Sequence, residues 1–168
     1  MNRYKNINIG DKAEITHIIT LRDIEKFVDL TGDDNKIHTD NEYASKTSFK
    51  KPVAHGMLGA SFISTVIGTK LPGDGALWYS QSLDFLQPVR VGDRLKIVAE
   101  VLKKIDRTKA IELKTEIYNQ NKQKVTTGIA KVKIIELQEN EAKREKHTRK
   151  TALVIGGTGG IGSATCLQ

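Results

Sequence analysis

The sequence predicts an α+β fold in which a long antiparallel sheet wraps around one central, buried helix. Residues 56–69 contain no charged side chain, and their apolar side chains surround most of a helix, which is typical of a buried one. From residue 95 to residue 134, apolar residues instead recur at every second position, the period of half-buried strands. A sheet that covers the helix accounts for both patterns.

The N-terminal part of the chain predicts a strand and then a helix. Residues 12–19 are strand-like, and Thr20 with Asp23 three positions later matches a capping box at a helix start. Gly32 stands where a C′ glycine is expected, so this helix ends there. Residues 40–45 predict a further short helical turn.

The remaining elements follow from turn signals and alternation. Leu71-Pro72-Gly73 closes the central helix, and four long strands are then expected around residues 78–86, 95–101, 111–117 and 130–134. Short turns containing Gly, Asp or Asn at Gly92-Asp93, at Asp106 and at 119–121 predict that consecutive strands are antiparallel neighbours.

Composition excludes several classes of protein. The chain has 168 residues, 38% apolar and 28% charged, which describes a soluble domain with a substantial core. Its single cysteine, Cys166, allows no intrachain disulfide, and residues 1–10 lack a secretory signal, so we expect a cytoplasmic protein. The stretch 53–69 is short for a bilayer and carries hydroxyl groups, so no membrane span is predicted.

The net charge of +7 raises the possibility of nucleic-acid binding. The lysines are dispersed among glutamates, and only 5% of residues are aromatic, so the chain lacks a surface on which bases could stack. We therefore expect a lysine-rich solvated surface and no nucleic-acid partner.

The C-terminal part changes character after residue 138. Residues 139–150 are densely charged and predict a linker. A strand-like run at 151–155 is followed by Gly156, Gly160 and Gly162, a spacing that resembles the opening of a short-chain dehydrogenase/reductase domain. A working dinucleotide site needs a further strand and an acidic residue about twenty positions on.

Six residues follow Gly162, so these glycines form an incomplete motif, and no cofactor is predicted for this chain. We expect residues 1–138 to form the functional domain, and residues 151–168 to be the disordered, truncated beginning of a Rossmann-type domain. The hypothesis that follows is a parent protein in which the domain of residues 1–138 is joined to a reductase domain.

The most informative segment for function is the loop that contains Asp33 and His38. In an extended chain these residues would stand roughly 17 Å apart, and on a helix about 140° apart around the axis. Gly32, Asp34 and Asn35 are residue types that favour a folded-back loop. Such a loop brings a carboxylate and an imidazole together, where they can hold one water and exchange protons.

With this loop, the block Ala54-His55-Gly56-Met57 and the block from Phe85 to Asp93, residues 1–138 resemble the MaoC-like (R)-specific enoyl-CoA hydratase/dehydratase family. The resemblance implies the hot-dog fold, in which a sheet wraps a central helix. Family members pair as dimers or contain a fused double copy. One copy is present here, so a homodimer is implied.

The resemblance also implies a hydro-lyase activity. Asp33 and His38 would activate one water that adds to a trans-2-enoyl thioester, carried on CoA or on acyl-carrier protein, to give the (R)-3-hydroxyacyl product. Asn35 would steady the site, and the backbone N–H of Gly56 would face the thioester oxygen. No metal is implied. Which of Asp33 and His38 carries which proton stays open.

Alternatives remain at this stage. A hot-dog thioesterase would be expected to carry its acid on the central helix, which has none from residue 56 to 69. The intact Asp33 and His38 pair counts against a non-catalytic dimerisation or acyl-thioester-binding module, but Lys36 keeps this alternative open, because the family usually has proline there to stiffen the loop. His55, beside Gly56, is interpreted as a structural rather than a catalytic histidine.

Overall fold

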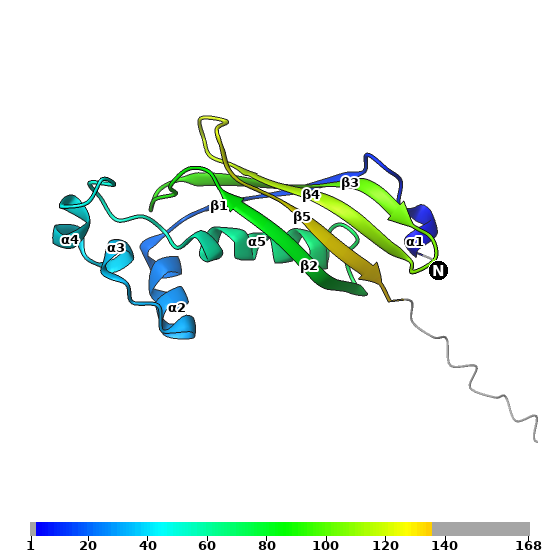
Figure 1. The fold of residues 1–168 in the computed structure, drawn as a ribbon, viewed down its shortest axis with the longest axis horizontal. Helices are drawn as coiled ribbons and strands as arrows, with labels where there is room; N and C mark the ends of the chain where they lie inside the picture. Colours follow the sequence, from blue (N-terminus) through cyan, green and yellow to red (C-terminus); the bar gives the residue numbers. More distant parts are fainter. Residues whose placement is uncertain (1–2, 136–168) are drawn as a thin grey trace, which may run out of the picture. The chain divides into compact units, whose positions relative to one another are not determined.

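A computed structural model of the chain describes residues 3–135. It contains a five-stranded antiparallel sheet with the strand order β1-β3-β4-β5-β2 (Figure 1). The strands are β1 Lys12–Ile18, β2 Ala76–Phe85, β3 Arg94–Ile105, β4 Ala110–Tyr118 and β5 Lys124–Ile134. The helices are α1 Arg3–Asn6, α2 Leu21–Thr31, α3 Lys36–Thr39, α4 Asn41–Ser45 and α5 Gly56–Thr69.

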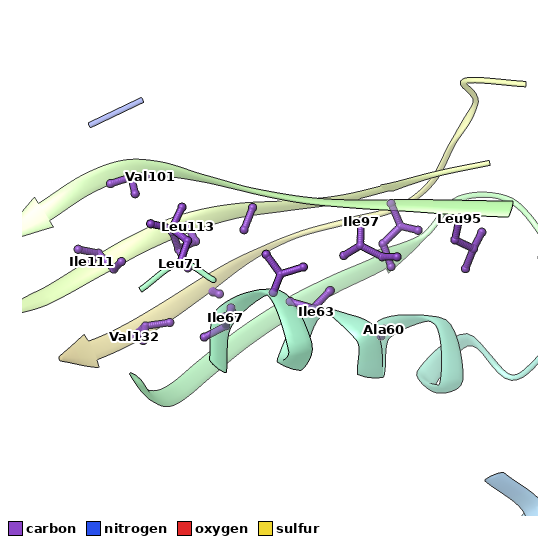
Figure 2. Close-up of a cluster of buried hydrophobic side chains, with 14 of the residues drawn as sticks. Ala60, Ile63, Ile67, Leu71, Leu95, Ile97, Val101, Ile111, Leu113 and Val132 are labelled. Atoms are coloured by element: carbon purple, nitrogen blue, oxygen red, sulfur yellow. The ribbon is translucent and has the colours of Figure 1, made fainter. Parts of the chain in front are cut away.

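Helix α5 lies along one face of the sheet, and the core fills the space between them (Figure 2). The alternation predicted for the strands is observed, since β3 and β5 bury every second side chain over most of their length. Buried residues of the helix meet buried residues of the strands, among them Ala60, Ile63, Ile67, Leu95, Ile97, Val101, Ile111, Leu113 and Val132. The predicted α+β fold is confirmed.

The all-round burial expected for α5 is only partly found. Leu58, Ile63 and Val66 are buried, whereas Met57 is 56% exposed and Ser61 is exposed in the single chain. The sheet covers one side of the helix and leaves the other side open.

The turns at Asp106 and at 119–121 join antiparallel neighbours, as predicted. The expectation for Gly92-Asp93 is wrong, because β2 and β3 are not neighbours: β2 pairs with β5. This turn instead extends the β1–β3 ladder. The Gly92 N–H donates to the Ile19 carbonyl at 2.8 Å, and the Ile19 N–H donates to the Asp93 carbonyl at 2.9 Å.

The predicted linker at 139–150 and the segment 151–168 with Gly156, Gly160 and Gly162 lie outside the described residues. Among the helices of residues 3–135, none combines the length and the apolar character needed to cross a bilayer.

Candidate active site

Helix α2 determines where the Asp33 loop begins. Its capping box is formed as predicted, with the Asp23 N–H donating to the Thr20 hydroxyl and the Asp23 carboxylate accepting from the Thr20 N–H. The same carboxylate accepts from His17 Nε2 at 3.0 Å. Burial raises the pKa of Asp23, but the bonds from His17 and Thr20 outweigh burial and leave the pKa below its ordinary value. The start of α2 is thus fixed to β1.

The other end of α2 closes at Gly32, as expected from the sequence. Gly32 has φ 74°, a left-handed conformation that glycine adopts without a steric penalty, and its N–H donates to the Val28 carbonyl at 2.7 Å. Asp33 follows at once, and its carboxylate is about half exposed. Helix α2, capped at both ends, therefore places Asp33 at the edge of the site.

The folded-back loop predicted between Asp33 and His38 is present, although His38 lies in the short helix α3 rather than in the loop itself. Asn35 is the N-cap of α3: its side-chain oxygen accepts from the Ile37 N–H at 3.2 Å. The backbone N–H of Asn35 donates to Asp33 Oδ1 at 3.4 Å. Asn35 therefore joins the carboxylate to the helix that carries the imidazole.

The orientation of His38 is set by one hydrogen bond. Its Nδ1 lies 2.7 Å from the Val53 carbonyl oxygen, and the Val53 N–H donates to the Ile37 carbonyl at 3.2 Å. A carbonyl oxygen can only accept, so His38 Nδ1 carries the hydrogen. In the neutral ring Nε2 is then left with a free lone pair, which can accept a proton.

His55, interpreted from the sequence as a structural histidine, lies close to both Asp33 and His38. Its side chain is buried, its Nε2 donates to the Asp33 backbone carbonyl at 2.9 Å, and its ring centroid lies 3.8 Å from that of His38. Asp33, His38 and His55 each place one oxygen or nitrogen atom within 4.8 Å of the others. In the sequence, only the position of His55 beside Gly56 indicated that it could lie near the candidate site.

Gly56 is the first residue of α5, as the sequence predicted. Within residues 3–135 its backbone N–H donates no hydrogen bond, and the partial positive charge of a helix start is concentrated on such groups. A cavity of about 560 Å³ adjoins it, lined mostly by apolar side chains, together with His38 and His55. Asp33 does not line this cavity.

The carboxylate and the two imidazoles are also the residue types that hold zinc. His38 Nδ1 and His55 Nε2 both donate to carbonyl oxygens, which leaves His38 Nε2 and His55 Nδ1 with free lone pairs. A ligating histidine commonly donates its other ring N–H to such a carbonyl, so these bonds are compatible with a metal ion as well as with a bound water.

Comparison with known proteins identifies the chain's relatives. Residues 6–123 match the family described as MaoC like domain. The (R)-specific enoyl-CoA hydratase of Rhodospirillum rubrum is 39% identical over 115 residues, which are 68% of this chain and 80% of the relative. The (R)-specific enoyl-CoA hydratase of Aeromonas caviae is 35% identical over 130 residues, 77% of this chain and 97% of the relative.

Among solved structures, the unliganded R-hydratase PhaJ1 from Pseudomonas aeruginosa superimposes with a TM-score of 0.74 at 39% identity. The match covers 81% of this chain and 91% of that one. The order of elements, the sheet wrapped on α5 and these matches agree: the chain belongs to the MaoC-like domain family and has the hot-dog fold.

Proposed function

We propose that this chain catalyses the (R)-specific hydration of trans-2-enoyl thioesters, and the reverse dehydration, with one water held by Asp33 and His38. The observation that carries the proposal is the approach of the Asp33 carboxylate and the His38 imidazole to within 4.8 Å. A water that bonds to two groups at about 2.8 Å each holds them about 4.5 Å apart. The names of the relatives supply the reaction and its (R) specificity.

The proton exchange follows from the free nitrogen of His38. As the water oxygen attacks C3 of the enoyl group, the water loses a proton and C2 gains one. His38 Nε2 is the free acceptor, because Nδ1 is committed to the Val53 carbonyl. Asp33 orients the same water from the other side, and its partial exposure lets it exchange protons with solvent.

The thioester oxygen gains negative charge during this attack, and Gly56 supplies a donor for it. The Gly56 N–H is free of other bonds within the described chain and lies at the positive end of α5. The adjoining cavity is largely apolar, so a bound acyl chain that displaces water from it would strengthen this interaction. We infer that the acyl thioester, carried on CoA or on acyl-carrier protein, binds with its carbonyl oxygen here.

Asn35 supports the site without contact with the substrate. Its side chain caps α3 and its backbone N–H reaches Asp33, so it fixes the distance between the carboxylate and His38. The catalytic roles proposed here therefore belong to Asp33, His38 and the Gly56 N–H, with Asn35 as a positioning residue.

Hydration of crotonyl-CoA by the full chain tests the proposal. The enoyl absorbance should disappear with time, and chiral analysis should identify the product as (R)-3-hydroxybutyryl-CoA. Asp33→Asn and His38→Ala should each lower kcat by at least about a hundredfold, the usual contribution of a general acid or base. An inactive wild type on short, long and carrier-protein thioesters would refute the function, whereas unaffected variants would refute only the residue assignment.

We also propose that two copies of the chain pair as a homodimer. Strand β2 is at an edge of the sheet, with Leu77 50% exposed and Tyr79 54% exposed (Figure 1). Beside it, residues of α2, α5 and β2 line an apolar hollow of about 620 Å³ that includes Met57 and Trp78. A second copy placed on β2 would cover both the open edge and the uncovered side of α5.

A further inference from the structure

We infer that His55 is a positioning residue of this active site, which holds the Asp33 loop by a hydrogen bond and the His38 ring by a close, tilted ring contact. This inference rests on the proposed function and adds to it a residue that acts through both proton-exchanging groups. His55 belongs to neither the Asp33 loop nor α3, since it directly precedes α5. It thus links three separate segments of the chain.

The hydrogen bond from His55 Nε2 to the Asp33 carbonyl joins an exposed loop to a buried side chain. Residues 31–36 are all exposed, and the Asp33 carboxylate lies 3.4 Å from the Asn35 nitrogen and 3.9 Å from His55 Nε2. By contrast, His55 is 3% exposed, and its Nε2 reaches the Asp33 carbonyl at 2.9 Å. A hydrogen bond shielded from water in this way resists competition by solvent and holds the backbone that carries the carboxylate.

The ring of His55 is held between two others. The Phe27 ring centroid of α2 lies at 4.8 Å, and the His38 ring centroid of α3 lies at 3.8 Å. Helices α2 and α3 and the start of α5 all lie at the same end of the domain (Figure 1). In this position the flat ring of His55 hinders rotation of the His38 ring and so helps to maintain the bond from His38 Nδ1 to the Val53 carbonyl oxygen.

The hydrogen bonds of His55 favour a positioning part over a direct part in proton exchange. Nε2 must carry a hydrogen, because its partner is a carbonyl oxygen. Nδ1 is buried and has no hydrogen-bond partner among the described residues, so a second hydrogen there would find no acceptor. The N–H of His55 that faces Asp33 is therefore already bonded to a backbone carbonyl, as a positioning residue requires.

Two substitutions separate the two contacts. His55→Gln keeps an N–H donor near the position of Nε2 and loses the ring, whereas His55→Phe keeps a ring and loses the donor. If the bond to Asp33 is the main contact, His55→Phe should lower kcat on crotonyl-CoA by about tenfold or more with KM within about twofold, because a small displacement of a catalytic group is costly. His55→Gln should recover most of that loss.

His17→Phe is the matched control, because His17 also combines one Nε2 bond, to Asp23, with one ring stack, on Phe62 at 4.1 Å. We expect it to lower Tm and to lower kcat much less than His55→Phe does, because His17 contacts neither Asp33 nor His38. If His55→Phe and His17→Phe lower Tm equally but His55→Phe lowers kcat far more, the effect is local to the site. Equal kcat losses in His55→Gln and His55→Phe at equal Tm, or no loss in either, would overturn the inference.

A measurement without substrate separates this inference from the proposed function. Imidazole ¹⁵N spectra of the wild type should show the neutral Nε2–H tautomer for His55, and a neutral Nδ1–H form or a charged ring would overturn the inference whatever the activity. Those spectra and His55→Gln also decide the matter if His55→Phe does not fold. A wild type that hydrates no thioester but shows the Nε2–H tautomer would refute the function and retain the geometry.

Discussion

At the scale of single residues, Gly56 shows how closely the site is packed. A Cβ atom placed on Gly56 would lie 2.9 Å from Cε1 of Phe85, closer than side chains pack without movement. Phe85 is itself half exposed and lines the same cavity as Gly56. The glycine therefore allows an aromatic ring and, in our proposal, a thioester oxygen to approach the start of α5 together.

We predict that Gly56→Ala lowers kcat for crotonyl-CoA by about tenfold, because the methyl group displaces the Phe85 ring and narrows access to the N–H, a loss smaller than that of a whole oxyanion donor. Steady-state kinetics on the purified variant measure this. Gly68→Ala is the control, since a Cβ on Gly68 meets nothing within 4 Å. Equal activity of the two variants would contradict the role given to Gly56.

At the scale of elements, α3 explains how the site tolerates Lys36 where the family usually has proline. Lys36 is the first residue of α3, a position where proline is favoured because its missing N–H has no helical partner. Asn35 before it has φ −48° and ψ 126°, an extended ψ that suits a residue before proline. The loop geometry is thus already the one that proline would impose.

Lys36→Pro should therefore raise the free energy of unfolding by about 0.4–1 kcal/mol, through the unfolded state, and leave kcat unchanged. Denaturant titration measures the first effect and crotonyl-CoA hydration the second. Ile37→Pro, one residue later, should destabilise the protein, because the Ile37 N–H is bonded to Asn35. If Lys36→Pro were the more harmful of the two, our description of α3 would be wrong.

The elements that the sequence predicted best are those with local signals. The capping box at Thr20, the left-handed Gly32 and the loop that unites Asp33 with His38 depend on residues close together in the chain. Strand order was not predictable in this way, since β2 pairs with β5 across more than forty residues. The closeness of Gly128 to the Ser82 carbonyl, where a Cβ would lie 1.9 Å away, depends on that pairing.

The contacts of His55 were not predictable for the same reason, because they join segments that are distant along the chain. The sequence favoured a structural role for His55, and its side chain is 3% exposed. Its contacts with Asp33 and His38 arise only when α2 and α3 fold back against the start of α5. The spacing of residues along the chain therefore does not predict the contacts of His55 with Asp33 and His38.

At the scale of the whole molecule, the domain leaves β2 and one side of α5 uncovered, which is why we propose a dimer. The full chain should elute in size-exclusion chromatography with light scattering at about twice its 18.6 kDa. Leu77→Asp on the open edge should shift it toward the monomer, because a charge would be buried there. Leu102→Asp, at an exposed leucine of β3, should not. A wild-type monomer at micromolar concentration would contradict the proposal.

The short distance between Asp33 and His38 has a stereochemical consequence. Both groups lie within 4.8 Å of each other, so in the proposed mechanism they act on one face of a bound double bond. We therefore expect the hydroxyl group and the new hydrogen to be added to the same face of the alkene, whichever residue transfers which proton. In deuterium oxide the product should be a single diastereomer with deuterium added syn to the hydroxyl, and NMR coupling constants would distinguish it from the anti product.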